Sequence, residues 1–196
     1  MISKLSNFLS EKFIQDSNDT IEDVEEYQFA LFIIISNAVY LLISIIVGLI
    51  LSSIIEMMLF YTIFQLLRIF AGGFHSNSEI RCEIISFLCI CLTGLLMFFS
   101  KYNTLINTVL FFSTFLSGLV NYCLSPIEAE AKPLTSKERK KYRRISLIIL
   151  CIIIIIINIT YSYKVSIIYI PCCLSLLLES ILLVAGAIKG RLVNGH

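Results

Sequence analysis

Charged residues are scarce in this chain: Asp, Glu, Lys and Arg make up only 15% of its 196 residues. Soluble domains carry about 25% charged residues, and here the hydrophobic share is 58%. The net charge is only +1, which leaves no global attraction for nucleic acid. This composition excludes an ordinary soluble domain and is typical of an integral membrane protein. We therefore expect a lipid bilayer around the chain and no nucleic-acid partner.

The chain also lacks the cysteine and histidine patterns of metal sites and disulfide frameworks. It has seven cysteines and two histidines, but no Cys-x-x-Cys pair and no Cys/His set with zinc spacing. The cysteine count is odd, and most of the cysteines lie inside apolar runs, which is typical of small buried hydrophobic residues. We expect no structural disulfides, no metal and no other cofactor.

The N-terminus lacks a continuous apolar region, so a cleaved signal peptide is not expected. Several apolar residues instead fall near one helical face, which predicts a short amphipathic helix on the membrane surface. They are Ile2, Leu5, Phe8, Leu9 and Phe13. We expect residues 1–27 to form this cytoplasmic helix and an acidic entry, residues 28–190 to form the membrane domain, and residues 191–196 to be a tail.

Six apolar stretches follow the N-terminal segment. They cover approximately residues 29–55, 57–71, 84–99, 104–124, 145–163 and 165–188. A membrane span needs about 20 apolar residues, and the second and third stretches are shorter. Either their ends recruit flanking residues, or the 72–83 connection dips into the membrane and is sheltered by protein. The expected fold is an all-α polytopic membrane helix bundle with about six membrane segments, two of them short or re-entrant.

The distribution of basic residues predicts the orientation. Seven of the 15 Lys and Arg residues lie in the 125–144 connection, so this loop is expected to be cytoplasmic by the positive-inside rule. Counting spans in both directions then places the N-terminus, the 72–83 connection and the C-terminus in the cytoplasm. Only Lys101 and Lys164 fall on the outside. The sequence therefore predicts a multi-pass protein of the cell membrane.

The polar stretch RIFAGGFHSNSEIRC at residues 68–82 contains a candidate catalytic pair, His75 and Cys82. A cysteine becomes an effective nucleophile when a neighbouring histidine takes up or stabilises its proton. On one continuous helix the two residues would lie about 10.5 Å apart along the axis, which is far outside hydrogen-bond reach. A dyad therefore requires a break in the helix between them.

The intervening residues can supply such a break. Gly72 and Gly73 can end the preceding helix with positive φ angles. A new helix can then start with Ser76 or Ser78 as a candidate cap and Glu79 in its first turn. Backbone N–H groups near Gly73 or at the start of this helix are natural oxyanion donors. The residue types alone are also consistent with a plain hairpin in which Cys82 is an apolar filler.

Other polar residues of the apolar stretches have more than one interpretation. Arg68 can extend its charge towards water, hold a substrate carboxylate, or orient the loop. Gln65 and Glu79 could each orient His75, and the sequence does not choose between them. Glu179 is an acid deep in the last stretch, for which a functional or helix-packing role is the default hypothesis.

The spacing of Arg68, Gly72-Gly73, His75 and Cys82, together with the SPIEAEAKPL start of the basic loop, resembles the AgrB (accessory gene regulator B) family of Gram-positive bacteria. The resemblance extends over essentially the whole chain. It implies an intramembrane cysteine endopeptidase that matures an AgrD-type quorum-sensing precursor. It further implies that Cys82 attacks a peptide bond near the precursor's C-terminus with His75 as base. A Cys or Ser within the precursor would then close a thiolactone or lactone ring.

The basic loop, including Lys132, Lys140 and Lys141, could meet the acidic tail of such a precursor, or it could serve topology alone. The resemblance also makes a homodimer plausible. Two other functions remain open. One is a transporter or channel for a peptide or ion, although the chain lacks convincing repeated halves. The other is a non-catalytic membrane scaffold.

Overall fold

The computed structural model describes residues 21–74, 79–127 and 135–194, and these form six α-helices. The helices are α2 (Ile21–Ile50), α3 (Ile54–Ala71), α4 (Glu79–Ser100), α5 (Thr104–Leu124), α6 (Ser136–Ser162) and α7 (Ser166–Asn194). Each of them contains a stretch long and apolar enough to cross a membrane. The predicted all-α membrane bundle is therefore confirmed, while the predicted surface helix before residue 21 lies outside the described residues.

The two stretches that were expected to be short are lengthened by their flanking residues. α3 has 18 residues and α4 has 22, which correspond to about 27 Å and about 33 Å at 1.5 Å per residue. α4 begins at Glu79, earlier than the expected start at residue 84. Conversely, α2 ends at Ile50 rather than near residue 55, because the chain turns at Ser52, where φ is 50°. A re-entrant connection is not needed to explain the length of either helix.

The chain divides into two compact units, Met1–Ile43 and Ser44–His196. The described part of the first unit is the N-terminal portion of α2. The second unit holds the end of α2 and all of α3 to α7. All of the contacts considered below lie within the second unit.

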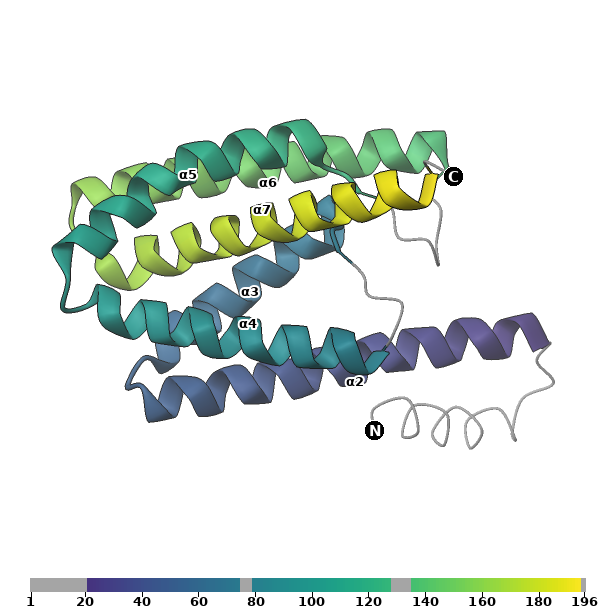
Figure 1. The fold of residues 1–196 in the computed structure, drawn as a ribbon, viewed down its shortest axis with the longest axis horizontal. Helices are drawn as coiled ribbons and strands as arrows, with labels where there is room; N and C mark the ends of the chain where they lie inside the picture. Colours follow the sequence, from purple (N-terminus) through teal and green to yellow (C-terminus); the bar gives the residue numbers. More distant parts are fainter. Residues whose placement is uncertain (1–20, 75–78, 128–134, 195–196) are drawn as a thin grey trace. The chain divides into compact units, whose positions relative to one another are not determined.

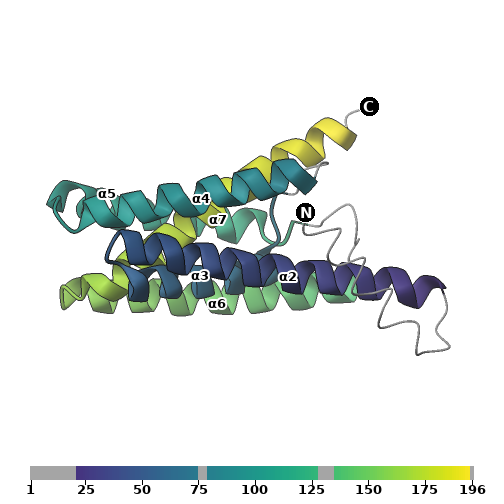
Figure 2. The same ribbon diagram turned by 90° about the horizontal axis from the view of Figure 1, so that it is seen from below.

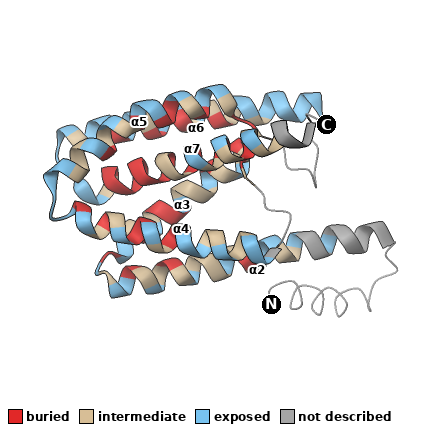
Figure 3. Cartoon of the chain, viewed as in Figure 1, coloured by how far each residue is buried: buried red, intermediate tan, exposed pale blue. Residues whose placement is uncertain are grey.

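α7 is the central helix of the second unit. It packs against α3, α4, α5 and α6, and Figure 1 shows it running between α5 and α3. In the view turned by 90°, it runs obliquely between α6 and α4 (Figure 2). In an 18-residue apolar stretch of α7, 61% of the residues are buried, against at most 28% in the corresponding stretch of each other helix. The difference is visible in Figure 3. Residues that α7 contributes to a site are therefore shielded from lipid by the other helices.

Small polar side chains connect α7 to its neighbours. The Thr114 hydroxyl donates to the Cys173 sulfur at 3.3 Å, and the Ser180 hydroxyl donates to that of Ser117 at 3.3 Å. The Ser175 hydroxyl donates to the backbone carbonyl of Phe60 at 3.1 Å. Small residues allow membrane helices to approach closely, and their hydroxyl groups hydrogen-bond across the contact. These contacts fix α7 against α5 and α3.

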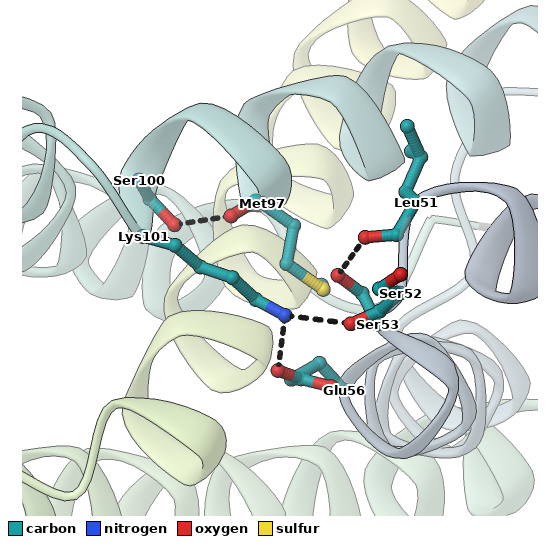
Figure 4. Close-up of polar contacts among 7 residues, drawn as sticks. All are labelled: Leu51, Ser52, Ser53, Glu56, Met97, Ser100 and Lys101. Atoms are coloured by element: carbon teal, nitrogen blue, oxygen red, sulfur yellow. Dashed lines mark hydrogen bonds and ion pairs between the residues drawn. The ribbon is translucent and has the colours of Figure 1, made fainter.

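An ion pair joins two turns at the end of the unit where α3 begins. Lys101 Nζ lies 2.8 Å from Glu56 Oε1 and donates to the carbonyl oxygen of Ser52 at 3.0 Å (Figure 4). Ser52 belongs to the turn before α3, and Lys101 to the turn after α4. We refer to this contact as the Lys101–Glu56 clip. It connects the start of α3 to the end of α4.

Candidate active site at the end of α3

α3 ends where the two consecutive glycines adopt positive φ angles, 76° at Gly72 and 131° at Gly73. The Gly72 N–H donates to the Arg68 carbonyl at 3.1 Å and closes the last turn. A Cβ atom at Gly72 would collide with the carbonyl oxygen of Ile127. Both the backbone conformation and the available space therefore require glycine at this position. The predicted helix end at the glycine pair is confirmed.

Residues 72–74, which we call the glycine strip, lie against α7 on one side and the segment after α5 on the other. The Phe74 N–H donates to the Leu182 carbonyl of α7 at 3.0 Å, and the Ile127 N–H donates to the Ala71 carbonyl at 2.9 Å. A Cβ atom at Gly186 would lie 3.0 Å from the carbonyl carbon of Gly73. The strip is thus fixed by backbone contacts that depend on small residues.

Arg68 binds the glycine strip from the last turn of α3. Its Nη1 donates to the Gly72 carbonyl at 3.0 Å, and its Nη2 donates to the Phe74 carbonyl. The side chain is partly buried. Of the alternatives that the sequence left open, this geometry matches orientation of the loop. Arg68 fixes the strip through main-chain oxygens, so the contact does not depend on the side chain at residue 74.

Glu179 faces the same strip from α7. Its side chain is fully buried, and neither carboxylate oxygen has a hydrogen-bond partner. A Cβ atom at Gly73 would collide with Arg68 Nη1 and lie 3.7 Å from Glu179 Oε1. The guanidinium group and the carboxylate therefore both lie near the place that a side chain of residue 73 would occupy. A buried carboxylate without a hydrogen-bond partner is costly. The packing of α7 alone therefore does not account for an acid at position 179.

Cys82 lies in the first turn of α4 as a partly buried free thiol. The first four N–H groups of a helix have no acceptor within the helix, so N–H groups beside Cys82 are free of helical bonds. Cys89 follows seven residues later and falls on nearly the same helix face.

The remaining predicted site residues are only partly within the described structure. His75, Ser78 and Lys132 lie outside the described residues, as does the side chain of Glu79, which begins α4. Gln65 is described, and its Nε2 donates to the Tyr61 hydroxyl at 2.7 Å. The pairing of His75 with Cys82 therefore stays a prediction.

The basic start of α6 lies beside the end of α3. The rings of Phe70 and Tyr142 pack with their centroids 5.9 Å apart, so the adjacent Lys140 and Lys141 belong to the same end of the unit as the glycine strip. Both lysines are exposed. Thr135 caps this helix in a reciprocal capping box with its third residue, Glu138. The lysines are consequently displayed from a well-formed helix start.

Sequence reasoning missed three residues that hold the glycine strip. Leu182 and Ile127 act through their backbone groups, which leave no signal in the residue type. Gly186 could have been noticed as a glycine within an apolar helix, since such a residue often marks a close backbone approach. Glu179 was recognised as an unusual buried acid, but its proximity to Gly73 depends on the packing of α7.

Comparison with known proteins identifies the family of the chain. It is 28% identical over 157 residues to an AgrB-like protein of Clostridium perfringens (strain SM101 / Type A), which covers 78% of this chain and 73% of that protein. AgrB-like protein 2 of Clostridium perfringens (strain 13 / Type A) is 27% identical with the same coverage. No solved structure matches the chain significantly. The profile described as accessory gene regulator B matches residues 2–183. The chain therefore belongs to the AgrB family, whose members act in the processing of autoinducing peptides.

Proposed function

We propose that this protein is a membrane-embedded cysteine endopeptidase that removes the C-terminal tail of an AgrD-type precursor and permits its cyclisation. Cys82 is the nucleophile and His75 the general base. The observation that carries the proposal is the fixed position of the glycine strip. Phe74, directly before His75 in the chain, is bound by Arg68 and α7, while Cys82 lies in the first turn of the next helix.

The reaction proceeds by two acyl transfers. His75 takes the proton of the Cys82 thiol, and the sulfur attacks the scissile carbonyl carbon of the precursor. The oxyanion that forms accepts hydrogen bonds from free N–H groups at the start of α4. The tetrahedral intermediate then expels the amine of the tail, which takes up the proton held by His75. The product is a thioester between Cys82 and the shortened precursor.

The second transfer closes the ring. A thiol or hydroxyl within the precursor gives its proton to His75 and attacks the thioester carbon, and Cys82 leaves as a thiolate that recovers the proton. Because both ends of the peptide are held at one site, ring closure is effectively unimolecular and outcompetes water. The apolar helices around the strip help to exclude water from the thioester.

Lys140 and Lys141 supply an attraction for the acidic tail of the precursor. They are exposed on the first turns of α6, and the contact between Phe70 and Tyr142 keeps this helix start beside the end of α3. Lys132 belongs to the same basic loop by sequence. The loop, the N-terminus and the C-terminus face the cytoplasm under the positive-inside rule. The precursor therefore reaches the site from the cytoplasm, where it is synthesised.

The test is cleavage of a co-expressed precursor, followed by mass spectrometry of the products. Cys82→Ala should abolish cleavage while the protein still accumulates in the membrane. Cys91→Ala is the matched control, because it removes a partly buried thiol from the same helix and should leave cleavage intact. Normal cleavage by Cys82→Ala would exclude the proposed chemistry and favour a transport or scaffold role.

A further inference from the structure

We propose that Glu179 is a positioning residue whose carboxylate compensates the charge of Arg68 beside Gly73 and thereby keeps the glycine strip docked on α7. For its activity readout the inference rests on the proposed peptidase function. Glu179 does not contact the reacting atoms in this scheme. It acts through Arg68, which binds the backbone on both sides of Gly73.

The burial of Glu179 is the first observation. Its side chain is fully buried in the centre of α7, and both carboxylate oxygens lack a hydrogen-bond partner. Ionisable side chains inside a membrane are rare and are almost always paired or functional. Packing alone would be served better by an apolar side chain of similar size. The carboxylate therefore requires a compensating charge close by.

Arg68 supplies that charge. Its guanidinium group is close to the Glu179 carboxylate at Gly73, although the two side chains form no ion pair within 4.0 Å. The Lys101–Glu56 clip is the ion pair found in the described residues. Both groups lie beside Gly73, since a Cβ atom there would collide with Arg68 Nη1 and lie 3.7 Å from Glu179 Oε1. The interaction is thus a charge attraction beside a glycine rather than a direct ion pair. Water screens it little on the side of Glu179, whose side chain is fully buried.

The helix face that carries Glu179 also holds the strip. Residues 179, 182 and 186 follow the i, i+3, i+7 spacing of one helical face. Leu182 accepts from the Phe74 N–H, and Gly186 gives the backbone of Gly73 room to approach. The carboxylate therefore draws the guanidinium group towards the surface on which the strip is docked. Without it, the uncompensated guanidinium gains by extending towards water and leaves the carbonyls of Gly72 and Phe74.

The experiment compares Glu179→Gln with Glu179→Asp in the full-length protein. Glutamine keeps the shape and removes the charge, whereas aspartate keeps the charge. We expect Glu179→Gln to lower kcat for precursor cleavage at least tenfold with little change in KM, and Glu179→Asp to retain activity within about threefold. Hydrogen exchange of peptides containing Phe74, measured by mass spectrometry in detergent, should become at least tenfold faster in Glu179→Gln only.

Glu56→Gln is the matched control, because it removes an acid from an ion pair at the other end of α3. It should change neither the cleavage rate nor the exchange of Phe74. A double-mutant cycle adds Arg68→Gln. If Glu179 acts through Arg68, the double variant is no slower than Arg68→Gln alone. If the double variant instead loses activity by the product of the two single losses, the proposal is overturned.

Two further outcomes separate this inference from the proposed function. If Glu179→Gln cleaves within twofold of the unsubstituted protein, or exchanges faster without losing activity, Glu179 is not a positioning residue. If the unsubstituted protein cleaves no precursor, the peptidase proposal fails, and the exchange of Phe74 alone decides whether Glu179 holds the strip. Should Glu179→Gln fail to accumulate, a tenfold loss in Glu179→Asp with unchanged exchange would overturn the inference.

Discussion

Gly73 is the residue at which the backbone, a cation and an anion meet. Its φ of 131° belongs to the region that favours glycine, and a Cβ atom would strike Arg68. The sequence predicted that the glycine pair ends α3, because helix ends with positive φ select glycine. It could not predict that Arg68 binds the carbonyls of Gly72 and Phe74, since the position of Phe74 depends on its contact with α7, which lies far along the chain.

Substitution Gly73→Ala should therefore damage the site in two ways. The methyl group displaces the Arg68 guanidinium, and the positive φ adds strain of about 1–3 kcal/mol. We expect cleavage of the precursor to fall at least tenfold, as measured by mass spectrometry of the products. Gly190→Ala is the control, because a Cβ atom there meets nothing within 4 Å. Equal activity of the two variants would contradict the assigned role of the strip.

At the scale of helices, α6 shows which features the distribution of charged residues can predict and which it cannot. The sequence predicted a basic connection at residues 125–144 from its lysines and arginines. It did not predict that residues 136–144 are the first turns of a long helix, because apolar periodicity begins only after them. The contact of Phe70 with Tyr142 could not be predicted either, since aromatic pairs leave no pattern within a single sequence. This contact is what associates the basic turns with the candidate site.

Reversal of charge at Lys140 and Lys141 tests this association. We expect the double substitution to glutamate to raise KM for the precursor severalfold and to leave kcat almost unchanged, because the lysines attract the tail and do not take part in bond breaking. High salt should likewise raise KM for the unsubstituted protein, because exposed charges are screened. Lys164→Glu, in the turn between α6 and α7, is the control. A changed kcat with constant KM would argue against the assigned role.

At the scale of the whole molecule, the sequence correctly predicted six membrane helices, because long apolar runs are a strong signal. It did not predict that α7 is the central helix, in which 61% of the residues of an 18-residue apolar stretch are buried. All six spans are apolar, and hydropathy does not distinguish lipid from protein as the neighbour. The contacts that favour α7 come from small residues such as Ser175 and Ser180, whose partners lie on other helices.

Orientation is the property of the whole chain that most needs a direct measurement. The distribution of lysine and arginine predicts that the turn at Tyr102 is outside and the segment at Thr135 is inside. We expect a cysteine introduced at Tyr102, in a variant without the native cysteines, to react with a membrane-impermeant reagent in intact cells. A cysteine at Thr135 should react only after the membrane is opened. The reverse pattern would place the candidate site outside the cell and would exclude a precursor that arrives from the cytoplasm.

The Lys101–Glu56 clip gives the second unit a mechanical asymmetry. α3 packs mainly on α7 and α6, whereas α4 packs on α7 and α5, so the clip is a direct tie between α3 and α4 at one end. At the other end, the same helices are joined by the connection that contains His75. Two rods pinned at one end separate most at the other. We therefore expect the clip to hold the start of α3 and the end of α4 together, so that any change in the separation of the two helices is largest near Cys82.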